Sequence, residues 1–370
     1  MREYLLVLLI AAGTTYLLAG ACRGIAVRFG VLAKVRDRDV HTHPIPYFGG
    51  IAMLGGLAVA LLVALQMPFL GRYAAVMHDA SAVLWAGLII TAVGALDDKY
   101  DLNPLVKLGG QVLAAGVAVV GGVRLFWIPL PGRIISLDDA TSILLTVLVI
   151  AVCVNAVNFV DGLDGLSSGI VAIGSGAFFS YTYVLAYVEG LERATTASLI
   201  TVATCGVAIG FLFHNWHPAK MFMGDSGSML LGLLMAMSAI SYTGRMDPSV
   251  VGGGSAVVPA MLPILLPVAA LALPLIDLVT AWIRRAWKGQ NPFSADKQHL
   301  HHRLLAHGHS HWGAVLLMYG WAAAVSVGLV AMALVPRTST VWIVVGVLAV
   351  LALLTLLPVR SRRSEARSDA

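Results

Sequence analysis

The stretch ILLTVLVIAVCVNAVNFVDGLDGLSSG, residues 143–169, begins as a long apolar run and then places two amides and two carboxylates at the end of that run. Asn155, Asn158, Asp161 and Asp164 follow one another at three-residue steps, after which hydrophobic sequence resumes. A helix that crosses a membrane needs about 20 predominantly apolar residues. The stretch therefore predicts a membrane-spanning helix that ends in a cluster of oxygen-bearing side chains.

The composition of the whole chain is that of an integral membrane protein. Of the 370 residues, 59% are hydrophobic and 12% are charged, whereas a soluble domain carries roughly 25% charged residues. Cys22, Cys153 and Cys205 lie in apolar segments without metal-ligand spacing, so neither a disulfide framework nor a zinc site is expected. The apolar stretch from Tyr4 to about Cys22 lacks a convincing cleavage site and is interpreted as a retained helix.

About eleven transmembrane helices are predicted when the chain is divided into spans of about 20 apolar residues. Their approximate cores are 4–22, 49–66, 82–96, 105–121, 141–158, 165–187, 195–213, 226–242, 256–283, 313–335 and 339–358. We therefore expect an all-α polytopic membrane protein. Residues 1–358 are expected to form a single transmembrane catalytic domain, followed by a basic cytoplasmic tail, 359–370.

The distribution of Lys and Arg predicts how these helices are oriented. The loops after the first, third, fifth, seventh and ninth helices, together with the tail, hold 17 of the 24 basic residues, and the remainder of the chain holds 7. Cytoplasmic loops carry an excess of Lys and Arg. The N-terminus is therefore predicted to lie outside and the C-terminus in the cytoplasm.

Five polar motifs follow the same alternation along the chain. Each follows an odd-numbered helix: HTHPIPYFGG (41–50), ALDDKYDLNP (95–104), NAVNFVDGLDGLSSG (155–169), HNWHPAKMFMGDSGS (214–228) and NPFSADKQHLHHRLL (291–305). Ionisable groups at membrane depth are costly and usually serve a function. An active site built from the cytoplasmic loops is therefore predicted.

The residue types in these motifs indicate phosphate chemistry. Carboxylates come from three of the loops: Asp97, Asp98, Asp161, Asp164 and Asp225. Gathered carboxylates raise one another's pKa unless a cation neutralises them, and oxygen ligands without thiolates favour Mg²⁺ or Mn²⁺. Basic side chains that suit anionic oxygens accompany them: Lys107, Lys220, His299, His301, His302 and Arg303. Together these groups predict phosphoryl transfer involving a lipid.

Helix geometry assigns some of these residues to different tasks. Neighbours on a helix point ~100° apart, so Asp97 and Asp98 are not expected to share one role. Asn155 and Asn158 differ by only ~60° and can face one cavity. The sequence GDSGS places Asp225 just before an apolar run, where the free N–H groups of a helix start also suit phosphate.

Four motifs in this order, LDDKYDL, NAVNFVDGLDGL, FMGDSGS and NPFSADKQHLHHRL, resemble the polyprenyl-phosphate N-acetylhexosamine-1-phosphate transferases. The resemblance covers about residues 41–304. The final motif is similar to the undecaprenyl- or decaprenyl-phosphate N-acetylglucosamine 1-phosphate transferases. The branch that makes the first peptidoglycan lipid intermediate has three consecutive histidines, whereas Leu300 interrupts the run here.

The resemblance implies a reaction and its partners. N-acetylglucosamine 1-phosphate would pass from UDP-N-acetylglucosamine to a polyprenyl phosphate lipid, giving polyprenyl-diphosphate-N-acetylglucosamine and UMP, with Mg²⁺ (or Mn²⁺) as cofactor. This would be the first membrane step of cell-envelope polysaccharide synthesis, in a bacterial inner membrane with the active site facing the cytoplasm. No nucleic-acid partner is expected, and the sequence leaves a homodimer open.

The resemblance also implies roles for the carboxylates and amides. Asp97 is the expected base for the lipid phosphate, and Asp98 is its partner near the metal. Asp225 is expected to bind the metal, with Asp98 and Asp161 as further ligands. Asn158 and Asp161 match positions for the nucleotide sugar or the metal, Asn155 is grouped with them as a substrate contact, and Asp164 lies beside the uridine.

The remaining implied contacts concern the nucleotide and its phosphates. Phe222 is expected to stack on uracil and Lys107 to face the phosphates. His299, His301 and His302 are expected to contact the diphosphate and sugar, with Arg303 continuing that basic surface.

Three alternatives stay open from the sequence. The runner-up is a phospho-N-acetylmuramoyl-pentapeptide transferase of peptidoglycan synthesis. A cation transporter would also use intramembrane carboxylates, but it should carry polar groups at mid-membrane and on the outer side. A structural membrane partner predicts no phosphate-binding chemistry. Asp277, inside an apolar stretch, is interpreted as an interhelical hydrogen-bond partner.

Overall fold

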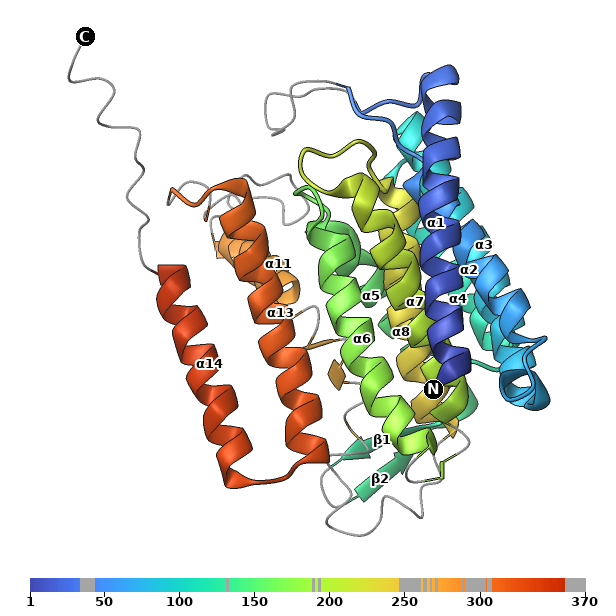
Figure 1. Cartoon of the computed structure of the whole chain (residues 1–370), viewed down its shortest axis with the longest axis vertical. Coiled ribbons are helices and arrows are strands. Elements are labelled where there is room, and N and C mark those ends of the chain that lie inside the picture. The colour runs from blue at the N-terminus through green and yellow to red at the C-terminus, as the bar shows by residue number, and fades with distance from the viewer. Residues whose placement is uncertain are drawn as a thin grey trace.

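Long helices that pack side by side dominate the computed structural model (Figure 1). The structure describes residues 1–33, 44–130, 133–187, 190–191, 194–245, 261, 265–266, 268–269, 272–287, 289, 304 and 308–356. The helices are α1 (Arg2–Arg28), α2 (Gly49–Ala64), α3 (Ala74–Tyr100), α4 (Pro104–Val120), α5 (Asp139–Val160), α6 (Leu166–Tyr187), α7 (Ala194–Asn215), α8 (Gly224–Arg245), α11 (Ala272–Trp287), α13 (His311–Leu334) and α14 (Thr338–Leu356), with a short 3-10 helix at Leu70–Arg72.

Among the described residues, eight helices are long and apolar enough to cross a membrane, and α2 and α4 are shorter apolar helices. This confirms a polytopic helical membrane protein. The predicted helix at 256–283 is observed only in part. Most of residues 256–271 lie outside the described residues, and α11 covers Ala272–Trp287. Helix α3 is longer than its predicted core, 82–96, since polar residues at both of its ends remain helical.

A two-stranded antiparallel hairpin adds to the expected all-α architecture. Strand β1 (Trp127–Leu130) pairs with β2 (Arg133–Ser136), with Trp127 opposite Ser136. The hairpin lies at the end of the bundle where the N-terminus also lies (Figure 1). Its four-residue strands are too short for hydropathy to distinguish from a loop between two helices.

Helix α8 lies at the centre of the bundle and packs against α2, α3, α5 and α7. In its most apolar window 94% of the residues are buried, compared with 6% in α14, which packs on α13 at the edge of the molecule. A helix surrounded by neighbours is apolar on all sides. Because α8 has neighbours on several sides, its first turn contacts the ends of other helices, such as Asp98 on α3 and Asn158 on α5.

Polar residues set where the helices begin and end. The Asn103 side chain accepts a hydrogen bond from Leu105 N at the start of α4, and Pro104 occupies the first turn. Asp138 and Ser310 cap α5 and α13 in the same way. Side-chain caps of this kind satisfy backbone N–H groups that have no partner within the helix. The polar motifs are thus placed at helix ends, where the candidate site forms.

Candidate active site

The centre of the candidate site is a lysine that lies between two carboxylates from different helices. Lys107 Nζ, on α4, lies 3.2 Å from Asp97 Oδ2 on α3 and forms a second, shorter ion pair with Asp225 Oδ2 on α8. Asp97 Oδ1 also accepts a hydrogen bond from Leu102 N at 2.9 Å. Residues 97–107, at the end of α3 and the start of α4, therefore meet Asp225, which is more than 100 residues further along the chain; the alternation of the motifs predicted that Asp97 and Asp225 would lie at one end of the bundle.

Asp98 has a different task from its neighbour. Its carboxylate accepts hydrogen bonds from Asp225 N at 2.7 Å, Ser226 Oγ at 2.9 Å and Ser226 N at 3.3 Å. An anion in this position satisfies free N–H groups at the start of α8 and is favoured by the helix dipole. Gly224 has a φ of +67°, and a Cβ there would overlap the Asp98 carboxylate, so glycine is required. Asp97 and Asp98 thus have different partners, and the separate roles expected for them stay predictions.

The two asparagines of α5 also bind different groups. Asn158 Nδ2 donates to Asp225 Oδ1 and to Ser228 Oγ, each at 2.9 Å. Asn155 Nδ2 donates to Gln111 Oε1 at 2.7 Å, and Gln111 Nε2 donates back at 3.4 Å. Asn158 thus orients Asp225, whereas Asn155 joins α5 to α4.

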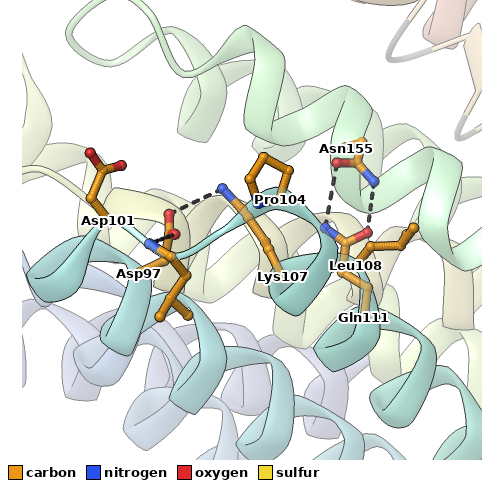
Figure 2. A pocket seen from close by; sticks show the side chains of 8 residues that line it. Asp97, Asp101, Pro104, Lys107, Leu108, Gln111 and Asn155 are labelled. Atoms are coloured by element: carbon orange, nitrogen blue, oxygen red, sulfur yellow. Dashed lines mark hydrogen bonds and ion pairs between the residues drawn. The ribbon is translucent and has the colours of Figure 1, made fainter. Parts of the chain in front are cut away.

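An open cleft of about 320 Å³ lies beside these groups. Figure 2 shows Asp97 and Lys107 pointing toward one another in it, with the paired amides of Gln111 and Asn155 nearby. Its remaining lining residues are Asp101, Leu102, Pro104 and Leu108. The cleft combines one cation, two carboxylates and an apolar wall; the Lys107 ammonium suits an anionic head group, and the apolar wall suits a hydrocarbon chain.

Asp161 lies directly after α5, where its carboxyl group interacts electrostatically with Asp98 and Asp164. Burial, followed by the charges of Asp98 and Asp164, raises the pKa of Asp161 to about 8. Near neutral pH the site therefore holds a proton on this carboxyl, or else a cation that allows it to ionise. The donor set of carboxylate and amide oxygens without sulfur fits Mg²⁺.

Asp164 lies in a second cluster, next to two histidines. Its Oδ2 accepts hydrogen bonds from His217 Nδ1 at 2.6 Å and from Ala219 N at 3.1 Å. Ligand atoms of Asp164, His217 and His311 lie within 4.8 Å of one another. The two imidazole rings are nevertheless stacked, with centroids 3.9 Å apart and planes 19° from parallel. Lone pairs in parallel planes do not converge on one ion, so this arrangement favours hydrogen bonding over metal binding.

The first polar motif reaches the site through the backbone next to Phe222. Phe222 N donates to Pro46 O at 2.9 Å, and Phe222 O accepts from Gly49 N at 3.2 Å. The Tyr47 and Phe222 ring centroids lie 6.2 Å apart. These two backbone hydrogen bonds thus join the first polar motif to the segment that leads into α8.

Some predicted residues are not brought into this site by the described part of the chain. His299, His301, His302 and Arg303 lie outside the described residues, as does the side chain of Asp277. Lys220 is exposed. The roles implied for these residues stay predictions.

Gln111, His217 and His311 were not selected from the sequence, although the structure places each next to a selected residue. Gln111 lies four residues after Lys107 on α4, and positions four apart on a helix share a face. His217 is part of the quoted motif at 214–228. His311 had no comparable signal, because only the packing of α13 brings it to Asp164.

Comparison with known proteins identifies the family of this chain. The model of glycosyl transferase family 4 matches residues 80–243. The decaprenyl-phosphate N-acetylglucosaminephosphotransferase of Mycobacterium tuberculosis (strain ATCC 25618 / H37Rv) is 40% identical over 366 residues, which cover 98% of this chain and 90% of the relative. The probable undecaprenyl-phosphate N-acetylglucosaminyl 1-phosphate transferase of Bacillus subtilis (strain 168) is 31% identical, with 95% and 90% covered. The chain therefore belongs to the polyprenyl-phosphate N-acetylglucosamine 1-phosphate transferases.

Proposed function

We propose that this protein transfers N-acetylglucosamine 1-phosphate from UDP-N-acetylglucosamine to a polyprenyl phosphate. An oxygen of the lipid phosphate attacks the sugar-bearing phosphorus, the bond between the two phosphates breaks, and UMP leaves. The products are polyprenyl-diphosphate-N-acetylglucosamine and UMP. The observation that carries the proposal is the convergence of Asp97, Lys107 and Asp225 beside an open cleft, in a chain of this family.

The contacts support separate roles for these three residues. Asp97 lines the cleft and orients the lipid phosphate, and it accepts the last proton of that phosphate. A lipid phosphate is largely ionised near neutral pH, so orientation is the larger part of this role. Lys107 neutralises charge on the phosphoryl group during transfer, which is the main way in which enzymes assist such reactions.

We propose that the enzyme depends on Mg²⁺, with Mn²⁺ as a substitute. Asp225 would hold the ion, with Asp161 and Asp98 contributing further oxygens. The ion, when bound, would offset negative charge on the diphosphate. The raised pKa of Asp161 and the absence of sulfur ligands from this donor set support the assignment.

The membrane placement follows the charge distribution. We propose that the N-terminus lies outside, that the C-terminus is cytoplasmic, and that the active site faces the cytoplasm of a bacterial inner membrane. The excess of Lys and Arg in the loops that carry the site supports this orientation.

A donor assay tests the proposal. Purified protein in detergent is incubated with a polyprenyl phosphate and with either UDP-N-acetylglucosamine or the muramoyl-pentapeptide nucleotide, each labelled in the sugar. We expect labelled lipid only from UDP-N-acetylglucosamine, with UMP released in equal amount. Release of UDP would indicate an ordinary glycosyltransferase, and use of only the pentapeptide donor would establish the peptidoglycan reaction instead.

A further inference from the structure

The loop between α5 and α6, Asp161–Gly165, is held by side chains that the proposed reaction does not yet use. His217 Nδ1 donates to Asp164 Oδ2 at 2.6 Å. Asn215 Oδ1 accepts from Gly165 N at 2.9 Å. Asn215 is the last residue of α7, and His217 lies in the segment that follows it. One side of the loop is thus tied to the chain immediately before Phe222.

Helix α13 holds the other side of the same loop. His311, the first residue of α13, stacks on His217 with ring centroids 3.9 Å apart, and its Nε2 lies 3.4 Å from Asp164 O. Two turns further along, the Tyr319 hydroxyl donates to Gly165 O. The two rings are in face-to-face van der Waals contact, whereas 3.4 Å is long for a hydrogen bond. His311 therefore acts mainly by fixing the ring of His217.

The hydrogen bond from His217 determines how Asp164 is presented. A carboxylate only accepts, so His217 must carry its proton on Nδ1. Within the described part of the chain, the hydrogen bonds to this carboxylate go to Oδ2, from His217 and from Ala219 N. Oδ1 is thereby left for a ligand. A hydrogen bond between a charged and a polar group is among the stronger ones in proteins.

Further contacts surround the start of α13. Leu304, directly after Arg303, is 3% exposed, and its carbonyl accepts from His309 N at 3.2 Å. The Trp312 and Trp216 ring centroids lie 4.5 Å apart. The start of α13 thus contacts the segment after α7, and His309, two residues before α13, is hydrogen-bonded to Leu304.

We infer that His217 and His311 are positioning residues that hold Asp164, and with it the Asp161–Gly165 loop, in the orientation that binds the nucleotide part of the donor. The inference rests on the proposed function, because it assigns these residues to binding of UDP-N-acetylglucosamine. Neither histidine takes part in the transfer step.

Three substitutions of His217 test this role. An Asn amide places an N–H near the position of Nδ1, whereas Gln places it near Nε2. His217→Ala and His217→Gln should raise KM for UDP-N-acetylglucosamine roughly ten- to hundredfold, the range for loss of a hydrogen bond to a charged group. The KM of His217→Asn should stay within about threefold of that of the natural protein. The kcat should change little in all three variants, because the lost interaction stabilises the ground state and the transition state equally.

Binding of UMP, measured by calorimetry without acceptor lipid, should follow the same order. His311→Ala should weaken UMP binding and His311→Phe, which keeps a ring against His217, should preserve most of it. If His217→Ala does not fold in detergent, the Asn and Gln variants carry the comparison alone.

An unchanged KM in the Ala and Gln variants would overturn the inference, as would an equal rise in all three variants. A merely structural role would lower the active fraction and the melting temperature, but the KM of the Asn variant would not then differ from those of the Ala and Gln variants. If the natural protein turns over no UDP-N-acetylglucosamine, the proposed function fails; if it does and the variants break the order, only this inference fails.

Discussion

Replacing Lys107 by Gln should make the enzyme slower but strengthen its apparent affinity for Mg²⁺. The Lys107 ammonium pairs with Asp97 and with Asp225, the proposed metal ligand. Lysine and metal therefore compete for the negative charge of one carboxylate. The neutral Gln removes this competition, while it also removes a cation that stabilises charge on the phosphoryl group during transfer.

The magnitude follows from the distances and exposure of the pair. At an effective dielectric constant of about 20, two unit charges at the 3.2 Å separation of Lys107 and Asp97 attract by roughly 5 kcal/mol. Their side chains are 20% and 14% exposed. Desolvation and partial screening cancel most of that energy, leaving about 1–2 kcal/mol. Removal of one such pair at Asp225 corresponds to roughly tenfold tighter apparent metal binding, since 1.4 kcal/mol is tenfold.

The assay is turnover as a function of Mg²⁺ concentration at saturating donor and lipid. We expect the half-saturating Mg²⁺ concentration to fall about tenfold, and kcat to fall by roughly 10²–10³, the range for loss of one charge-stabilising group. Arg337→Gln is the charge-matched control, because Arg337 is exposed between α13 and α14, and it should change neither quantity. A Lys107→Gln variant that needs more Mg²⁺ would refute the competition between lysine and metal.

Three further predictions follow from the same site. Asp97→Asn should reduce kcat by roughly 10²–10⁴, as for loss of a general base, and unchanged turnover would exclude that role. Activity should disappear in chelator and return with Mg²⁺ or Mn²⁺; full activity in metal-free protein would contradict the carboxylate site. In metal-free protein, the raised pKa of Asp161, about 8 against 3.8 for a free carboxyl, means that protonation stabilises the fold. The melting temperature should therefore fall as pH rises from about 4 to about 8, and Asp161→Asn should flatten this dependence relative to the natural protein.

The sequence determined the class of the protein and predicted the chemistry of its site. Hydropathy alone predicted most of the long apolar helices, because a helix needs about 20 apolar residues to cross a membrane. The alternation of polar motifs predicted that distant carboxylates such as Asp97 and Asp225 would meet, and the angle between neighbouring residues predicted that Asp97 and Asp98 would face different groups. These are local properties, which do not depend on how one helix crosses another.

The tertiary structure decided which side chains touch. Lys107 lies between Asp97 and Asp225, although the sequence assigned it only to phosphates. Gln111 pairs with Asn155, and His311 contacts His217, which lies 94 positions earlier in the chain. Such contacts depend on helix crossing angles, close approach at glycines and side-chain rotamers. These variables leave no trace in hydropathy or spacing, because each is set by the partner helix rather than by the segment itself.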